Sequence, residues 1–297
     1  MTITIANGPV SWGVYYGGDP TNIPWQQYLD EVAAAGFTHT ELGPIGYMPE
    51  ERGRLSDELA KRGLTLVGGF IFEALHDPGE RDRLTALAHR TCTVLAGQGA
   101  RHYVIIDDLP AERARTAGRT EAAPRLPPDL WGGFMANIAE LARIARDGYG
   151  LVPVLHPHVG GYLEFADEVD AALADLPEDL VGLCLDTGHL AYAGIDPIAL
   201  YEQCASRVRY LHFKNVDPAA HRRAIAEELD LFGAISAGVF CPLGEGVVDF
   251  VRLRAALESH GYDGFATVEQ DSDPRAGAKP GEDAATSLAY LRRVGMI

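Results

Sequence analysis

The sequence predicts a single (β/α)₈ barrel, the TIM-barrel class of α/β fold, with a closed parallel sheet and one domain over residues 1–297. Eight short apolar runs alternate with longer segments of helical spacing along the whole chain, as expected of parallel strands that are buried on both faces. The length suits one barrel. A doubly wound open sheet is the alternative, which is disfavoured because no Gly-x-Gly-x-x-Gly turn follows the first run.

The eight predicted strands are ITIANGP (3–9), FTHTEL (37–42), LTLVGGFIF (64–72), HYVIID (102–107), LVPVLHP (151–157), VGLCLDT (181–187), VRYLHFK (208–214) and GFATVE (264–269). The segments between them place apolar residues at helical spacing. Gly36 and Gly63 are expected just after two of these helices, where glycine is favoured. Asp196 and Pro197 are expected at the N-cap and first position of another helix.

Two connections are longer than the others and follow strands four and seven. They cover residues 108–128 and 215–245, and the second contains a candidate short helix around AAHRRAIAEELDLF. Barrel enzymes keep their sites at the carboxyl ends of the strands, and long loops there commonly act as lids. We therefore expect both connections to cover a site mouth.

Composition and charge narrow the class of partner. Hydrophobic residues make up 47% and charged residues 23% of the chain, and the formal net charge is −17. So acidic a surface repels phosphate backbones and anionic lipid, so we expect a small-molecule partner, with neither nucleic acid nor membrane. Cys92 and Cys184 lie in apolar runs and are predicted to be reduced core thiols. No signal peptide or membrane span is recognisable, which favours a cytoplasmic protein, and a homo-oligomer is compatible with the sequence.

The ends of five predicted strands carry residues that can bind a metal or move a proton. They are Glu41, His156 and His158, Asp186 and His189, His212 and Lys214, and Glu269 and Asp271. Each has a simpler alternative: a structural histidine, a helix cap at Asp186, an ion-pair partner at Glu41, a surface carboxylate at Glu269. Because the carboxyl ends of barrel strands converge, their joint occurrence predicts one shared site.

Mixed carboxylates and imidazoles suit a divalent ion. Mn²⁺ or Co²⁺ is our first choice, with Mg²⁺, Fe²⁺ and Zn²⁺ as alternatives, and the lack of thiolate at the strand ends argues against a structural zinc. Such an ion polarises a carbonyl and stabilises an enediolate, while an imidazole with a pKa near neutrality moves the proton. Lys214 can bind a developing oxyanion. The expected substrate is a small polyhydroxylated ketone.

Five residues are predicted to contact that substrate: Trp12, Glu41, Tyr47, Phe72 and Asp271. Trp12 follows the first predicted strand, Phe72 ends the third and Tyr47 lies in the loop after Glu41, and an apolar ring face there can cover the C–H side of a sugar ring. The alternative for these aromatic residues is a role as anchors of the loop cores.

Several motifs carry a resemblance to a known family. GPVSWGV, THTELGPIGYMP, LHPHVGGYLEFADEVD, LCLDTGHLAYAG, VRYLHFKNVD, GVFCPLGEGVVDF and ATVEQD together resemble the xylose isomerase-like TIM-barrel family of sugar isomerases and epimerases. Within this family they are most similar to the inosose dehydratase branch, which removes water from 2-keto-myo-inositol. The resemblance covers nearly the whole chain, with the motifs in order.

The resemblance implies metal ligation by Asp186, His212 and Glu269. The fourth family ligand, usually a glutamate, comes from the end of strand five, where this chain has His156. Glu164 and Glu168 are alternatives for that ligand. His158 resembles a catalytic position of related dehydratases, and His189 resembles a histidine that contacts substrate. Asn215 stands where the branch usually has an aspartate.

These observations give one leading hypothesis and several rivals. The first is a metal-dependent lyase of inositol catabolism that dehydrates a cyclic polyhydroxy ketone such as 2-keto-myo-inositol through a metal-stabilised enolate, with His158 as base, Lys214 holding the enolate and His189 as acid. A keto-sugar isomerase or epimerase is second, and a lyase or hydratase of 3-keto glycosides also fits. A non-catalytic sugar-binding barrel is less consistent with the retained ligands. An endonuclease is disfavoured by the charge of −17.

Overall fold

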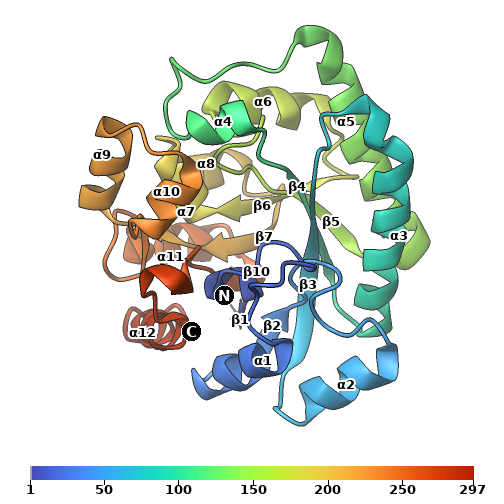
Figure 1. Ribbon diagram of the computed structural model, residues 1–297, viewed down its shortest axis with the longest axis vertical. Helices are drawn as coiled ribbons and strands as arrows, with labels where there is room; N and C mark the ends of the chain where they lie inside the picture. Colours follow the sequence, from blue (N-terminus) through green and yellow to red (C-terminus); the bar gives the residue numbers. More distant parts are fainter. Residues whose placement is uncertain (1) are drawn as a thin grey trace.

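The fold is a closed barrel of eight parallel strands, as the sequence predicts (Figure 1). The computed structural model describes residues 2–297. Around the barrel the strands follow the order β1-β10-β7-β6-β5-β4-β3-β2. They are β1 (Thr2–Asn7), β2 (His39–Glu41), β3 (Thr65–Glu73), β4 (His102–Asp107), β5 (Val152–Leu155), β6 (Gly182–Asp186), β7 (Val208–Phe213) and β10 (Asp263–Val268).

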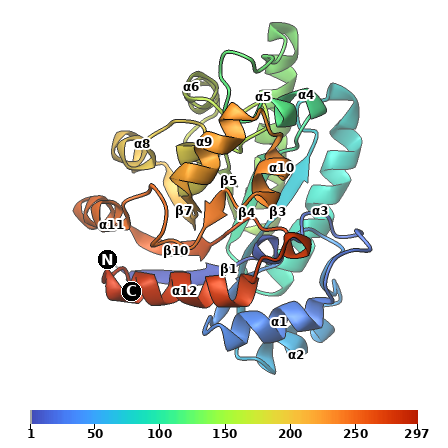
Figure 2. The same cartoon turned by 60° about the vertical axis from the view of Figure 1, so that its left-hand side comes forward.

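Helices surround the barrel and cover its outer face (Figures 1 and 2). The longer ones are α1 (Trp25–Ala34), α2 (Arg52–Ala60), α3 (Arg81–Gly97), α5 (Pro128–Arg143), α6 (Ala166–Asp175), α8 (Pro197–Cys204), α11 (Phe250–Ser259) and α12 (Pro280–Arg293). A short helix, α7 (Thr187–Tyr192), begins directly after β6. No helix within residues 2–297 is long and apolar enough to cross a membrane.

The local signals in the sequence are confirmed at the helix ends. Gly36 and Gly63 have φ angles of 96° and 65°, the left-handed conformation that glycine adopts without strain. Asp196 caps α8 by accepting hydrogen bonds from the backbone N–H groups of Ile198 and Ala199, with Pro197 in the first turn. Several predicted strands are one or two residues too long at their carboxyl ends, and the residues that lie beyond the observed ends include His156, Lys214 and Glu269.

The barrel interior is filled by side chains. The buried cluster inside it contains Ala6, Val67, Phe70, Val104, Ile106, Val154, Cys184 and Tyr210. Below it, the ring of His102 stacks on that of Tyr210, with centroids 4.3 Å apart. Cys92 and Cys184 are buried and free, as predicted. This packing closes the amino end of the barrel and leaves the carboxyl end for a site.

The two long connections contain structure of their own. The first carries α4 (Ala111–Arg115), and the second carries α9 (Pro218–Ala226), α10 (Leu231–Ser236) and an antiparallel pair formed by β8 (Asn215–Val216) and β9 (Phe240–Cys241). The candidate helix in the second connection is thus observed as two short helices.

Candidate metal centre and active site

Four predicted metal ligands meet at the carboxyl end of the barrel. The closest carboxylate oxygen of Asp186, Oδ2, lies 3.4 Å from His156 Nε2 and 3.7 Å from His212 Nδ1. His212 Nδ1 lies 3.2 Å from Glu269 Oε2. All four residues are buried. Parallel pairing sets this meeting, since β6 and β7 align Asp186 with His212.

The donor set fits a divalent ion. Asp186 Oδ2 and His212 Nδ1 are buried and have no hydrogen-bond partner among the described residues. An unsatisfied buried polar atom costs about 1–3 kcal/mol, and an ion bound between them would remove that cost. Imidazole and carboxylate donors suit Mn²⁺, Co²⁺, Fe²⁺ or Zn²⁺. The residues that would hold the ion are Asp186, His212, Glu269 and His156.

Asp186 has a second role that the sequence presented as an alternative. Its Oδ1 accepts hydrogen bonds of 2.8 Å from the backbone N–H groups of both Gly188 and His189, which caps α7. Asp186 can cap the helix and bind a metal at the same time, because one carboxylate oxygen caps α7 while the other faces the remaining ligands. Capping fixes the carboxylate plane and so directs Oδ2 toward the cluster.

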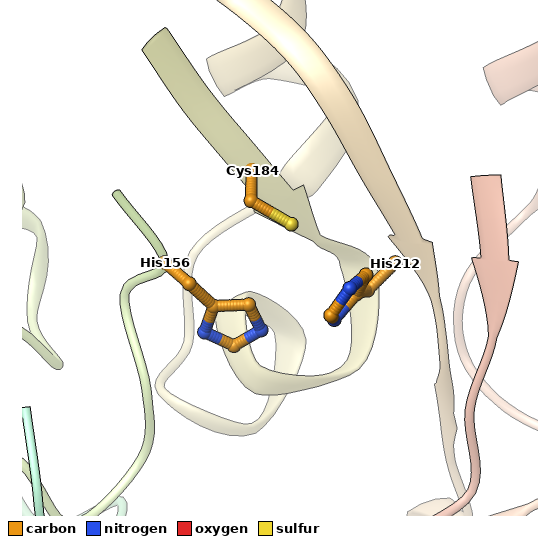
Figure 3. A group of neighbouring side chains, drawn as sticks. All are labelled: His156, Cys184 and His212. Carbon is orange, nitrogen blue, oxygen red and sulfur yellow. The ribbon is translucent and has the colours of Figure 1, made fainter. Parts of the chain in front are cut away.

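The thiol of Cys184 lies next to the predicted ligands, toward the amino end of the barrel, and the sequence analysis did not place it there. Figure 3 shows Cys184 directed from β6 toward the rings of His156 and His212, and Sγ and one nitrogen of each ring lie within 4.8 Å of one another. Burial raises the pKa of the Cys184 thiol to about 11, so it stays protonated. The signal was present in the sequence, because residues two apart in a strand share a face and Asp186 is two residues on.

Glu41 stands behind His212. Its Oε1 accepts a hydrogen bond of 2.6 Å from the Tyr210 hydroxyl and lies 3.1 Å from His212 Nε2. The Lys or Arg partner considered as an alternative for Glu41 is therefore replaced by a tyrosine and a histidine. A carboxylate on the far nitrogen of a metal-binding imidazole fixes its orientation and raises its basicity. In this position Glu41 contacts the His212 ring and does not line the cavity.

Lys214 occupies the centre of the acidic groups. Its Nζ lies 3.0 Å from Asp271 Oδ1, 3.2 Å from Glu269 Oε2 and 3.3 Å from Asp186 Oδ2. Burial disfavours the ammonium charge, but these carboxylates hold the pKa of Lys214 above its ordinary value. Burial raises the pKa of Asp271 to about 6 despite Lys214. Lys214 therefore carries a positive charge between these three carboxylates.

His158 and His189 lie against each other, with ring centroids 3.8 Å apart and ring planes tilted by 38°. His158 Nδ1 donates a hydrogen bond of 2.8 Å to the Val159 carbonyl, which leaves Nε2 with its lone pair. Desolvation, helped by His156 and Lys214, lowers the pKa of His158 to about 3. The expected imidazole pKa near neutrality is thus not met at His158. The ring is instead held neutral, with Nε2 unprotonated.

A small cavity lies between these polar groups and an apolar wall. It measures about 40 Å³, roughly the share of one or two water molecules. The polar side consists of His156, His158, His189, His212, Lys214, Glu269 and Asp271, and the apolar side includes Tyr15, Phe70, Phe72, Leu109, Leu231, Phe232 and Ile235. Leu109 comes from connection 108–128 and Leu231 to Ile235 from connection 215–245. Both connections therefore border the site, as expected.

Some predicted residues lie elsewhere. Trp12 packs edge-on against Tyr28 and donates a hydrogen bond to Glu31, and the ring of Tyr47 also lies beside that of Tyr28. Both are buried and neither lines the cavity, so their placement matches the alternative role as loop-core anchors. Phe72 and Asp271 do line it, and so does Tyr15, which no motif indicated.

Three further residues have contacts that the sequence could not give. Glu164 and Glu168, considered as alternative metal ligands, both bind Arg113 of α4 and do not reach the ion position. Asn215 Nδ2 donates hydrogen bonds to the Leu243 and Val248 carbonyls. A carboxylate could not donate these bonds, so the amide at position 215 is explained by loop packing.

The closed barrel and its strand-end cluster define the class: a (β/α)₈ barrel with a metal-competent centre of carboxylates and imidazoles. The family follows from comparison with known proteins. The chain belongs to the xylose isomerase-like TIM barrel family, whose model matches residues 29–294.

Individual relatives match over nearly the full length. The chain is 33% identical over 279 residues to the rhizopine catabolism protein MocC of Rhizobium meliloti, covering 92% of this chain and 83% of that protein. It is 28% identical over 301 residues to inosose dehydratase of Geobacillus kaustophilus, covering 98% and 94%. Among solved structures, the IolI protein with a bound zinc atom has the same fold, with a TM-score of 0.71, 14% identity and 98% coverage of both chains.

Proposed function

We propose that this protein is a metal-dependent carbon–oxygen lyase that dehydrates a cyclic polyhydroxy ketone of the inosose type. The observation that carries the proposal is a neutral imidazole of fixed tautomer, His158, beside a buried ammonium and a cluster of metal-competent ligands. The similarity to inosose dehydratases over nearly the whole chain supports the choice of substrate class. The acidic surface favours a small neutral ketone over nucleic acid or anionic lipid.

The ligands Asp186, His212, Glu269 and His156 would hold the ion, and Mn²⁺ or Co²⁺ suits them best. A bound ion would polarise the ketone oxygen and stabilise the negative charge that develops on it. Lys214 adds a hydrogen bond to the same oxygen, because its Nζ lies among Asp186, Glu269 and Asp271 at the polar side of the cavity. Fixed charges in a site of low water content stabilise developing charge strongly.

We assign the proton transfers to the two neighbouring histidines, His158 and His189. His158 Nε2 takes the α-proton, the C–H electrons form the new double bond, and the β C–O bond breaks. The departing hydroxyl then needs a proton. His189 Nε2 lies 2.9 Å from Lys214 Nζ, and an ammonium group cannot accept, so the hydrogen of His189 is on Nδ1. His189 Nδ1, which has no partner among the described residues, is our choice of donor to the departing hydroxyl. As it gives up its proton, the Lys214 ammonium passes one to His189 Nε2, so the imidazole stays neutral.

Proton NMR in D₂O with a panel of keto-inositols and keto-sugars tests the proposal. The expected result is loss of the α-proton signal together with release of one water molecule from an inosose. Exchange of the α-proton without loss of water would favour the isomerase or epimerase alternative. Activity only on 3-keto glycosides would favour the glycoside alternative, and neither exchange nor elimination on any ketone would leave a sugar-binding barrel. Asp186→Asn, prepared in parallel, should be inactive.

A further inference from the structure

A buried ion cluster lies beside the loop that carries His158, and none of its members has a role in the proposed reaction. We call it the arginine cluster. It consists of Arg113 on α4, Glu164 just before α6 and Glu168 within α6. Figure 1 shows α4 and α6. The Arg113 side chain is fully buried. It binds both oxygens of Glu168 at 2.9 Å and Glu164 Oε2 at 3.3 Å.

Arg113 also holds backbone on both sides of the cluster. Its Nε donates to the Gly161 carbonyl and its Nη1 to the Pro124 carbonyl, each at 2.9 Å. All five N–H donors of the guanidinium can thus be used, which makes this side chain a rigid connector. Glu168 has a second cation, since Arg125 Nη1 donates to its Oε1, whereas the buried Glu164 forms its ion pair with Arg113 alone among the described residues. Arg113 therefore ties α4 of connection 108–128 to the segment before α6.

Glu164 is linked to His158 by hydrogen bonds to a single peptide group, the one between Val159 and Gly160. Its Oε2 accepts a hydrogen bond of 3.0 Å from the Gly160 N–H, and its Oε1 accepts one of 2.6 Å from the Gly118 N–H. The peptide group that contains the Gly160 N–H also contains the Val159 carbonyl. That carbonyl accepts the hydrogen bond from His158 Nδ1.

A peptide group is planar, so rotation of this one would break both hydrogen bonds at once. Gly160 has a φ of 83°, a conformation that costs glycine little and that the carboxylate holds in place. Further bonds complete the loop: His158 N–H to the Leu163 carbonyl and Gly161 N–H to the His158 carbonyl. Without the carboxylate, nothing else among the described contacts holds the Gly160 N–H.

We propose that Glu164, held by Arg113, is a positioning residue that fixes the tautomer and orientation of His158 through the Val159–Gly160 peptide. The arrangement resembles a carboxylate–imidazole pair into which one peptide group has been inserted. Hydrogen bonds in such a chain polarise one another and so strengthen one another. The role of His158 as the base rests on the proposed function. The contacts of Glu164 do not.

Glu164→Gln tests the proposal, because the amide nitrogen places a donor against one of the two N–H groups that Glu164 accepts from. The first readout is the ¹⁵N NMR signature of the His158 ring in protein without substrate. Wild type should show the Nδ1–H tautomer, and the variant a mixture of tautomers. The second readout is kinetic: kcat should fall by about 10²-fold, the usual effect of a slightly misplaced catalytic group, while KM and metal content stay as in wild type.

A matched control separates positioning from loss of stability. Arg207 is a second buried arginine, and it binds only backbone carbonyls, those of Leu173, Leu176 and Val181. Arg207→Lys should lower the melting temperature as Arg113→Lys does, yet keep the His158 tautomer and kcat. Arg113→Lys should change both, and it replaces Glu164→Gln if that variant does not fold.

The proposal fails if Glu164→Gln and Arg113→Lys both keep the wild-type tautomer. It also fails if Arg207→Lys changes the tautomer equally. If the wild-type protein dehydrates no ketone, the proposed function fails, but the NMR readout still decides whether Glu164 positions His158.

Discussion

The double role of Asp186 allows its two functions to be separated by two substitutions. Asn at position 186 keeps an oxygen that can accept from the Gly188 and His189 N–H groups, but it replaces the ligand oxygen by an uncharged amide group. Ala removes both the cap and the ligand. The two variants should therefore behave alike toward the metal and differently in stability without metal.

The magnitudes follow from the cap and from the length of the chain. Asn and Asp cap helices about equally well, whereas loss of a cap to Ala costs roughly 0.5–2 kcal/mol. Unfolding entropy is about 2.1 cal/mol/K per residue, so for 297 residues 1 kcal/mol corresponds to a shift of about 1.6 °C in Tm. Apo Asp186→Ala should therefore melt about 1–3 °C below apo Asp186→Asn.

Metal binding gives the opposite comparison. An ion at one hundred times its Kd stabilises the folded state by about 2.7 kcal/mol, which is about 4 °C for a chain of this length. Wild type should show that increase with Mn²⁺ or Co²⁺, and neither Asp186 variant should show it.

Differential scanning calorimetry with and without the ion, together with elemental analysis after dialysis, measures both effects. His212→Ala serves as a second ligand variant. If Asp186→Asn retained full metal occupancy and the increase in Tm, Asp186 would not be a ligand. If the two apo variants melted together, the cap would contribute nothing and the contacts to Gly188 and His189 would carry no energy.

Three further outcomes follow. His158→Gln should bind metal normally and lose roughly 10²–10⁴-fold in dehydration and in α-proton exchange with D₂O; exchange at the wild-type rate without dehydration would make His158 the acid, and persistence of both would remove its role. Because a cavity of about 40 Å³ must open to admit a ring, trimming the α10 segment of connection 215–245 should lower turnover and substrate affinity, and unchanged kinetics would exclude a lid. Burial lowers the pKa of His102 to about 4, below the ordinary value in the unfolded chain. The unfolded state therefore binds more protons between about pH 6.5 and 4, and stability is lost as the pH falls through that range. On acidification to pH 4, the free energy of unfolding of His102→Phe should fall by up to about 3 kcal/mol less than that of wild type. Urea unfolding measures this difference, and an equal fall in both proteins would contradict the reasoning.

The sequence alone determined the barrel and the position of the candidate site along it. Runs of apolar residues report burial locally, so all eight strands could be found without tertiary information. Strand ends in a barrel converge by geometry, so polar residues at those ends could be assigned to one place. This is why Asp186, His212, Glu269 and Lys214 were predicted together and are found together.

Contacts between connections were beyond the reach of the sequence. Trp12 and Tyr47 follow strand ends, as a substrate contact would, but their loops fold back onto α1. Glu164 lies eight residues after His156, close enough in sequence to be a candidate ligand. Only the path of α4 shows that its partner is Arg113.

The depth of a residue inside the barrel was also decided by tertiary structure. Glu41 ends β2 and was expected to face the substrate, but the stagger of the strands places it behind His212. Cys184 shares a face with Asp186 and lies one layer deeper, beneath the ligands. Periodicity gives the face of a strand, whereas the register between neighbouring strands sets the height at which a side chain meets its partners. That height separates a group that touches substrate from one that orients a ligand.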